Sequence, residues 1–223
     1  MNRFYLLRLF LVFFLLSGAP FSIAAPSQQT DEQALDARVR AFLDSQRGKW
    51  RGWNVPESDG RVLYDLIVKH NYRRALEIGT STGHSAVWIA WALSKTGGKL
   101  VTVEIDEGRY RQALANFEKA GLSHLIDARL ADARQLVDEL DGPFDFIFVD
   151  ADKSWYTNYF KALASKLEVG GCYTAHNVTE SGWGSVAGSG TAEFYAYVKG
   201  LPNMKTRIDD SGRGISISYK IAP

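Results

Sequence analysis

Residues that could do chemistry follow two apolar runs of the sequence. Asp150, Asp152 and Lys153 directly follow one run, and His176 and Asn177 end another. Two carboxylates and an ammonium at the mouth of a buried strand are costly to desolvate unless they pair or bind something. The ordinary interpretation is a helix N-terminus with acidic caps. Because His176 and Asn177 reach the same sheet edge, we favour a candidate site with two further metal-ligating side chains.

A glycine-bearing turn follows a third apolar run, in the segment 77–85. Gly79 and Gly83 allow close approach of a ligand, and the next helix offers free N–H groups to a carboxylate. Ser81 stands where the dinucleotide fingerprint has its second glycine, so a pyrophosphate ligand is disfavoured. Glu104 ends the next apolar run, where an acid can accept both hydrogen bonds of a ribose diol. The ordinary alternatives are a tight turn and a solvated loop acid, but their spacing favours a nucleoside site.

Apolar runs alternate with helical stretches, and this alternation positions the candidate residues. Runs typical of buried strands lie at residues 75–78, 100–105, 144–149 and 172–175, with a weaker one at 125–130. The pattern predicts a mostly parallel sheet covered on both faces. Residues 204–208 and 215–220 flank a turn and predict an antiparallel hairpin with a half-exposed second arm.

Helical periodicity predicts the covering elements. Helices are expected over residues 35–43, from an N-cap at Ser58 through Ile67, over 110–117 with a C-terminal cap at Gly121, and over 156–167 closed by Gly170 and Gly171. Residues 27–33 are polar and are expected to form a disordered linker.

Composition limits the function classes. With 223 residues and 46% hydrophobic content, the chain can bury one sizeable core. Its 26 basic and 25 acidic side chains give a formal charge of +1 without a basic stripe, which argues against nucleic acid and favours a small-molecule acceptor. The single cysteine, Cys172, excludes an intramolecular disulfide and is expected to be a buried thiol.

The N-terminus resembles a secretory signal peptide. Arg3 and Arg8 precede an apolar stretch at 9–16, and small residues at Ser22 and Ala24 suit a signal peptidase. The alternative is an uncleaved membrane anchor over 4–24. Both place the main domain on the far side of the membrane, so the chain is expected to be exported (periplasmic or secreted) or membrane-anchored. We therefore divide the chain into a signal or anchor (1–24), a linker with an N-terminal helix (25–57) and one domain (58–223).

From about Val55 to Gly182 the chain resembles the catechol and caffeoyl-coenzyme A O-methyltransferase family. Segments 77–85 and 145–153 carry the resemblance, and the tail 214–220 fits the family's last strand. The resemblance implies a Rossmann-like methyltransferase fold, which is α/β and doubly wound, with a mostly parallel seven-stranded sheet and a C-terminal antiparallel hairpin. It also implies a homodimer and an O-methyltransferase that moves a methyl group from S-adenosylmethionine to a hydroxyl of a small phenolic or catechol-like acceptor.

The resemblance further implies roles for individual residues. The methionine end of the cofactor would be lined by Glu77, Gly79 and Thr80, its carboxylate held by Ser85, and its ribose held by Glu104. The adenine would lie at Asp132 and Ala133, with Val55 and Asp152 completing the pocket. Asp150 would be a metal ligand and Lys153 the general base, near a cation that lowers the pKa of the acceptor hydroxyl.

One departure from the family pattern concerns the metal. The family's usual Asp-Asn ligand pair reads His176-Asn177 in this sequence. Mg²⁺ prefers oxygen ligands, so the ligand set of Asp150, His176 and Asn177 suits Mn²⁺, Fe²⁺ or Zn²⁺ better. Alternatively no metal binds, and His176 acts as a base or hydrogen-bonds the loop. Both alternatives remain open at this point.

The acceptor side is defined less sharply. Trp53, Trp155, Tyr156 and Trp183 flank the expected mouth and could stack on an aromatic acceptor, although bulky aromatics are as often core or rim packing. A competing function is an exported, non-catalytic binding protein, favoured by His176 in a ligand position and by export away from the cofactor supply. A nucleic-acid methyltransferase is disfavoured by the charge balance.

Overall fold

A single seven-stranded sheet forms the centre of the computed structural model, which describes residues 26–50, 52–179 and 190–223. The strands are β1 (Arg74–Ile78), β2 (Lys99–Glu104), β3 (Ile126–Leu130), β4 (Phe144–Val149), β5 (Leu167–His176), β6 (Met204–Asp209) and β7 (Ile215–Lys220). Their order is β3-β2-β1-β4-β5-β7-β6. The first five pair in parallel, and β7 is antiparallel to both β5 and β6. The predicted sheet and C-terminal hairpin are confirmed.

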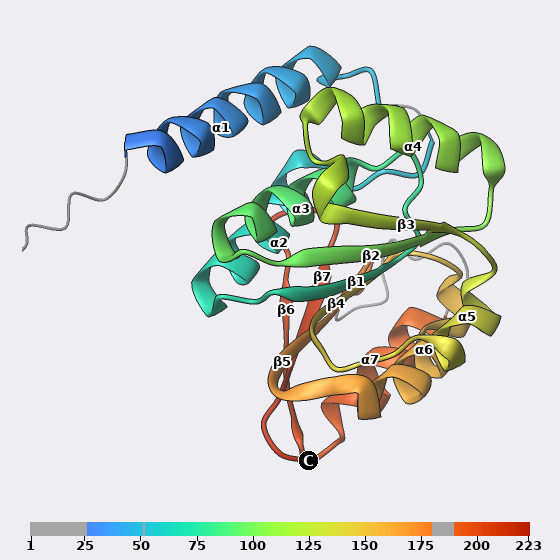
Figure 1. Ribbon diagram of the computed structural model, residues 1–223. Coiled ribbons are helices and arrows are strands. Elements are labelled where there is room, and N and C mark those ends of the chain that lie inside the picture. Colours follow the sequence, from blue (N-terminus) through green and yellow to red (C-terminus); the bar gives the residue numbers. More distant parts are fainter. Residues whose placement is uncertain (1–25, 51, 180–189) are drawn as a thin grey trace, which may run out of the picture.

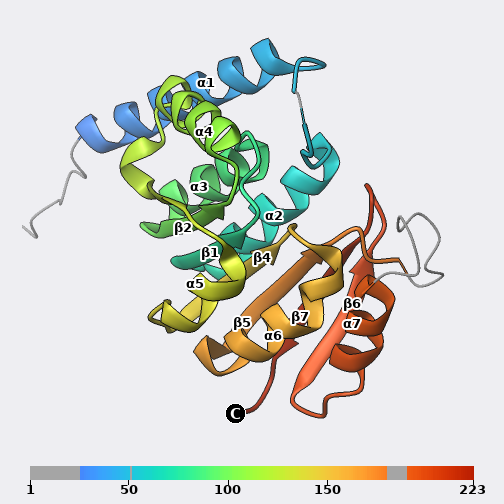
Figure 2. The same ribbon diagram turned by 90° about the vertical axis from the view of Figure 1, so that its right-hand side faces the viewer.

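Helices cover both faces of the sheet (Figures 1 and 2). One face carries α1 (Pro26–Gln46), α2 (Glu57–His70), α3 (His84–Thr96) and α4 (Glu107–Ala120), and the other carries α5 (Ala133–Glu139), α6 (Tyr156–Leu163) and α7 (Gly190–Lys199). Short 3-10 turns lie at η1 (Ser123–Leu125), η2 (Lys153–Trp155) and η3 (Ala164–Lys166). Each layer buries its own apolar cluster against the sheet, so the strands are covered as a mostly parallel sheet requires.

The strand order reverses between β1 and β4, because the chain moves outward from β1 to β2 and β3 and then returns to the other side. In open α/β sheets ligands bind at the carboxyl ends of the strands beside this switch point. The two strand ends touch there: a Cβ at Gly79 would lie 2.5 Å from the carbonyl oxygen of Asp150. Gly79 also has a φ of +98°, so both space and backbone conformation require glycine.

The N-terminal helix is longer than predicted and belongs to the same packed unit. Residues 27–33, expected as a disordered linker, lie within α1. Arg38 donates to the carbonyl oxygens of Glu118 and Lys119 at the end of α4, at 2.6 and 2.9 Å. Val39 is fully buried in the core shared with α2 and α3. Tertiary packing and capping of α4, rather than the polar composition of the segment, decide its conformation.

Other boundaries differ for local reasons. The N-cap of α2 is Pro56, so Ser58 lies inside the first turn. Gly170 and Gly171 lie within β5, beside a register shift in its pairing with β4, instead of closing the preceding helix. Strand β7 is not half-exposed: Ser216 and Ser218 are fully buried, because β7 lies inside the sheet, between β5 and β6, and α7 packs on it. The C-terminal cap at Gly121 and the buried thiol of Cys172 are confirmed.

The predicted signal or anchor segment, residues 1–24, lies outside the described residues. Among the helices that the structure describes, none combines the length and apolar character needed to cross a membrane.

Candidate active site

The predicted site residues converge at the carboxyl ends of β1, β2, β4 and β5. They form two parts, which we name separately. The glycine-turn half consists of Glu77, Gly79, Thr80, Ser81, Ser85 and Glu104, and the Asp150 half consists of Asp59, Asp150, Lys153, Tyr156 and His176. The contact between Gly79 and Asp150 joins the two halves.

Glu77, in β1, is fully buried and incompletely paired. Its Oε2 accepts a hydrogen bond from the Thr102 hydroxyl at 2.5 Å, and Ser85 also hydrogen-bonds the carboxylate. Its Oε1 has no partner among the described residues. Burial raises the pKa of Glu77 to about 7, and the nearby charges of Asp150 and Glu104 add to this effect. The hydrogen bonds from Ser85 and Thr102 oppose it. An unpaired buried acceptor of this kind is suited to a cationic or hydrogen-bond-donating ligand.

Glu104 ends β2 and ties that strand to the glycine turn. Its Oε2 accepts from the backbone N–H of Ser81 at 2.7 Å, and its Oε1 accepts from the N–H groups of Ile105 and Asp106 at 3.1 and 2.9 Å. A carboxylate has about four acceptor positions, so capacity for a ligand remains after these bonds. The buried hydroxyl of Ser81 has no partner among the described residues. The glycine-turn half is thus rigid but still carries unused polar atoms.

Val55 is brought to this half by a histidine. The indole N–H of Trp88 donates to Nε2 of His84 at 3.1 Å, so Nδ1 carries the ring hydrogen and donates to the carbonyl oxygen of Val55 at 2.8 Å. Burial lowers the pKa of His84, consistent with this neutral tautomer. The loop before α2 is therefore fixed against the start of α3.

The expected adenine end lies at the ends of β3 and β4. Asp132 caps α5, and Ala133 is its first, buried residue. Asp152 caps η2. The Arg134 guanidinium lies 3.7 Å from Asp132 and 3.9 Å from Asp152, and its Cζ lies 5.9 Å from the ring centroid of Trp155. The predicted residues of this end are therefore close together.

In the Asp150 half, Lys153 is held by two partners. Its Nζ forms an ion pair with Oδ1 of Asp150 and lies 2.8 Å from the Tyr156 hydroxyl. That hydroxyl lies 3.1 Å from the carbonyl oxygens of both Val149 and His176. Tyr156 is fully buried and packs edge-on against Phe194, so it orients Lys153 and does not stack on an acceptor.

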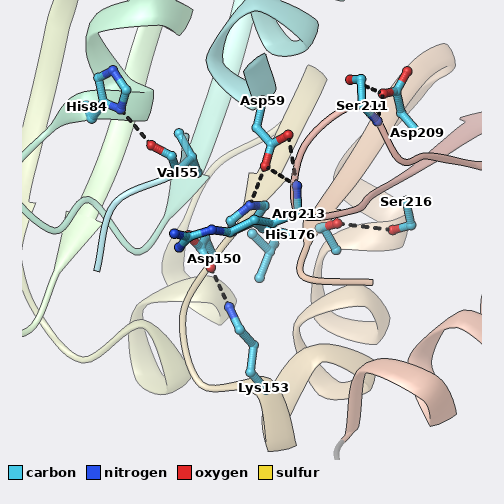
Figure 3. Close-up of polar contacts among 12 residues, drawn as sticks. Val55, Asp59, His84, Asp150, Lys153, His176, Asp209, Ser211, Arg213 and Ser216 are labelled. Carbon is cyan, nitrogen blue, oxygen red and sulfur yellow. Dashed lines mark hydrogen bonds and ion pairs between the residues drawn. The ribbon is translucent and has the colours of Figure 1, made fainter. Parts of the chain in front are cut away.

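His176, at the end of β5, lies between two carboxylates (Figure 3). Its Nδ1 is 3.1 Å from Oδ2 of Asp150, and its Nε2 is 2.7 Å from Oδ2 of Asp59. Burial opposes the charged ring, but the hydrogen bonds and charges of Asp150 and Asp59 outweigh it and raise the pKa of His176. Burial also opposes ionisation of Asp150, yet His176 and Lys153 together lower the pKa of that carboxyl.

Asp59 is a site residue that the sequence reasoning missed. It lies in the first turn of α2, is 1% exposed, and accepts from the backbone N–H of Arg213 at 3.3 and 3.1 Å. A signal was available, because Asp59 shares the helical stripe of Leu63, Leu66 and Ile67, which are buried. A carboxylate on an apolar stripe requires a partner in the core.

The donor atoms of the expected metal ligands do not fit a divalent cation. Both ring nitrogens of His176 face carboxylate oxygens, and both oxygens of Asp150 are engaged, by Lys153 and His176. A metal-ligating histidine must present a lone pair, which a ring donating from both nitrogens lacks. Asn177 follows β5 with a left-handed φ of 57°. Among the residues that the structure describes, no group of three or more His, Cys, Asp or Glu side chains is arranged to hold a metal.

The aromatic residues at the expected mouth separate into different environments. Trp53 is 78% exposed, whereas Trp155 is half-buried and packs against Tyr159. Trp183 lies outside the described residues. Trp53 and Trp155 therefore remain candidates for contact with an acceptor, and Tyr156 does not.

Comparison with known proteins gives a consistent result. A model of the O-methyltransferase family matches residues 27–211. Caffeoyl-CoA O-methyltransferase 2 of Eucalyptus globulus is 36% identical over 156 residues, 67% of this chain and 62% of that protein. Catechol O-methyltransferase of Niastella koreensis is 38% identical over 133 residues, 58% of this chain and 60% of that protein. The aligned region thus spans about three-fifths of the length of these curated relatives.

Solved structures show the same fold. The O-methyltransferase from Bacillus cereus in complex with SAH is 26% identical, with a TM-score of 0.67, over 85% of this chain and 96% of that one. The O-methyltransferase TomG from Streptomyces achromogenes, in complex with SAM, is 25% identical, with a TM-score of 0.69, over 83% of this chain and 90% of that one.

Proposed function

This chain belongs to the O-methyltransferase family, and on that premise we propose that it transfers the methyl group of S-adenosylmethionine to a hydroxyl of a small aromatic acceptor. The observation that carries the proposal is the contact of the two strand ends at Gly79 and Asp150. This contact brings Glu77 of β1, whose Oε1 has no partner among the described residues, to the same edge of the sheet as the Asp150–Lys153 ion pair that follows β4. The relatives are named as enzymes, which supports transfer over the non-catalytic alternative.

The residues of the glycine-turn half fit the cofactor. When bound, S-adenosylmethionine supplies an activated methyl group on a sulfonium. Glu77, with its unpaired Oε1, would accept from the positively charged methionine end, and Ser85 would hydrogen-bond its carboxylate. Glu104 would use its remaining acceptor capacity on the ribose hydroxyls. The Bacillus and Streptomyces proteins were solved with SAH and SAM, which supports S-adenosylmethionine as the cofactor.

Lys153 would act as the general base. Its amine form would take the proton from the acceptor hydroxyl, so that the O–H bond breaks and an N–H bond forms at Nζ. The freed oxygen would then bond the methyl carbon, while the C–S electron pair remains on sulfur. Lys153 would release its proton to solvent at the end of the cycle. Asp150 and Tyr156 fix Nζ, and this alignment provides much of the acceleration.

In this mechanism protein side chains, and not Mn²⁺, Fe²⁺, Zn²⁺ or Mg²⁺, assist removal of the proton from the acceptor. The reason is that the potential metal-ligating atoms are already engaged: His176 faces Asp150 and Asp59, and Asp150 also pairs with Lys153. For the acceptor, Trp53 follows Gly52, where a Cβ would lie 3.6 Å from the Ser81 hydroxyl, and Trp155 lies beside Arg134; these two aromatic residues support a phenolic or catechol-like substrate.

A radiolabel experiment tests the proposed function. The purified chain would be incubated with methyl-tritiated S-adenosylmethionine and catechol, caffeic acid, phenol or an aliphatic alcohol. We expect label in the catechol products, together with micromolar cofactor binding measured by calorimetry. Binding without transfer to any of these acceptors would contradict the acceptor class, and absence of cofactor binding would contradict methyl transfer itself.

We also propose an export or anchoring role for residues 1–24, and a homodimer for the folded part. The basic, apolar and small-residue order of that segment supports the first, and the family resemblance supports the second. N-terminal sequencing of the protein from membrane and soluble fractions tests the first. A mature chain beginning near Ala25 is expected, and an intact Met1 in a soluble cytosolic fraction would contradict it. Light scattering of the purified protein tests the dimer.

A further inference from the structure

The Asp59–His176–Asp150 chain is a largely buried polar group of the described site. His176 is 2% exposed and Asp59 is 1% exposed. Asp59 and His176 are 117 residues apart in the sequence, yet Nε2 and Oδ2 meet at 2.7 Å. Figure 3 shows the ring of His176 between the two carboxylates, with Lys153 on the far side of Asp150. Burial of such a group is costly unless its charges and hydrogen bonds are satisfied within the protein.

The hydrogen-bond partners fix the chemical form of the ring. Ionised carboxylates are acceptors only, so each ring nitrogen facing one must supply a hydrogen. A neutral imidazole supplies one hydrogen, and an imidazolium supplies two. With Asp59 at Nε2 and Asp150 at Nδ1, both nitrogens act as donors. The ring is therefore a fixed cation, held against the carboxylate that also binds Lys153.

We propose that the His176 imidazolium, positioned by Asp59, takes the place of a divalent cation at Asp150, so that methyl transfer proceeds without a metal, and that the residue at position 176 decides this. The inference rests on the proposed function, because it assigns the source of positive charge at the same acceptor site. The imidazolium balances Asp150 and adds positive charge beside Lys153, where the acceptor oxygen becomes negative. Asp59 is a positioning residue, since it acts only through His176.

The surroundings of Asp59 hold the pair closed. The backbone N–H of Arg213 donates to both carboxylate oxygens. Gly212 packs so tightly on the carboxylate that a Cβ at that position would lie 1.6 Å from Oδ1 of Asp59. The turn between β6 and β7 therefore keeps Asp59 on His176. A metal would have to displace Asp59 or Lys153 from a satisfied hydrogen bond before it could bind.

Binding of Mn²⁺ separates the alternatives without relying on activity. We would measure the metal alone against the purified full chain by calorimetry and by electron paramagnetic resonance. The wild type is expected to show no stoichiometric site, whereas His176→Asp places a third oxygen ligand beside Asp150 and Asn177. We expect Mn²⁺ to bind this variant at least about 100-fold more tightly than the wild type and to raise its Tm. His124→Asp, which changes an exposed histidine, is the matched control and should resemble the wild type.

A second variant protects the test against misfolding. His176→Asp leaves Asp59 facing a new carboxylate in the core, so the double variant Asp59→Asn/His176→Asp removes that repulsion. It is expected to fold and to bind one Mn²⁺. Stoichiometric Mn²⁺ binding by the wild type would overturn the proposal. Failure of the folded double variant to bind Mn²⁺ would overturn the role of position 176.

The role of Asp59 has its own readout. Asp59→Asn removes the counter-charge of the ring while keeping the shape of the side chain. We expect this variant to have a kcat about tenfold lower than the wild type, with KM for S-adenosylmethionine unchanged. Catalysis by the wild type should be insensitive to a chelator. Asp65→Asn, an exposed acid on the same helix, is the control. An equal rise in KM, or loss of wild-type turnover in chelator, would overturn the proposal. If no acceptor is methylated at all, the proposed function fails, while the Mn²⁺ measurements still decide the inference.

Discussion

The two halves of the site differ in how completely the protein satisfies them. In the glycine-turn half, Oε1 of Glu77 and the hydroxyl of Ser81 are buried without partners among the described residues. In the Asp150 half, each carboxylate oxygen and ring nitrogen of the Asp59–His176–Asp150 chain faces a partner. A surface prepared for a polar ligand retains unused donors and acceptors, because the ligand supplies the missing bonds. The glycine-turn half therefore leaves polar atoms for a ligand, whereas the Asp150 half is completed by side chains and backbone of the protein itself.

The largest expected effect would break the Asp150 half alone. Lys153→Met removes the proposed base, so kcat should fall about 10³-fold, within the range for a general base. Cofactor affinity should stay at the wild-type value, because the contacts of the glycine-turn half are untouched. Radiolabel transfer measures kcat, and calorimetry measures the affinity for S-adenosylmethionine. The variant Lys205→Met, at an exposed lysine, is the control. Full activity in Lys153→Met would show that another group takes the proton of the acceptor.

The next effect concerns the stability of the glycine-turn half. Burial raises the pKa of Glu77 to about 7, from an ordinary value of 4.5. Its contribution to the free energy of unfolding is fully present below the unfolded pKa and is lost as the pH rises through about 7. Glu77→Gln has no such loss. Between pH 4.5 and 8, the free energy of unfolding of the cofactor-free variant should therefore rise relative to that of the wild type, by about 3 kcal/mol at most.

Urea unfolding of both proteins across this pH range measures the difference. A constant difference would show that Glu77 does not titrate in this window. At pH 8 the same variant should bind S-adenosylmethionine more weakly than the wild type, because it lacks the carboxylate charge. Unchanged binding would remove Glu77 from the cofactor site.

A smaller change should weaken the cofactor without altering the chemistry. Glu104→Gln keeps the side-chain shape but loses a charged acceptor, and hydrogen bonds to charged groups are worth about 1.5–3 kcal/mol. The Kd for S-adenosylmethionine should rise roughly 10- to 100-fold, with kcat at saturation close to the wild-type value. Glu107→Gln, whose side chain forms an exposed pair with Arg111, serves as control. A fall confined to kcat would contradict the division between the halves.

The smallest effect tests how Lys153 is held. Tyr156→Phe removes the hydroxyl that lies 2.8 Å from Nζ and leaves the Asp150 ion pair in place. The loss of one hydrogen bond, worth about 1 kcal/mol, should lower kcat about fivefold. Steady-state kinetics at saturating cofactor measure it. A loss as large as that of Lys153→Met would instead make Tyr156 a participant in proton transfer.

The features that the sequence predicted best depend on local patterns. The strand at 144–149 has the same bounds in the sequence prediction and in the structure. The glycine turn and the acid that ends β2 also follow from runs of neighbouring residues. The hairpin and the cap at Gly121 are also local. The prediction was wrong where tertiary packing decides. The alternating residues of β7 suggested an exposed face, but α7 packs on this strand and buries its serines.

The Asp150 half shows the other limit. The sequence placed Asp150, Lys153 and His176 at one edge, and the structure brings them together. Asp59 was not predicted, because its partners His176 and Arg213 lie 117 and 154 residues away. No local period links such positions, and only the folded sheet brings α2 against the end of β5. In the mechanism that we propose, the choice between a metal and the His176 cation depends on that one distant residue.

The buried Asp59–His176 pair also constrains how related sequences could diverge. Loss of His176 alone would leave the buried Asp59 carboxylate without a charged partner, which typically costs about 3–5 kcal/mol. A single change of this kind would remove much of the free energy of unfolding of an ordinary domain. Positions 59 and 176 should therefore vary together among descendants of this chain, and a lineage that regains an aspartate at 176 should first have neutralised residue 59.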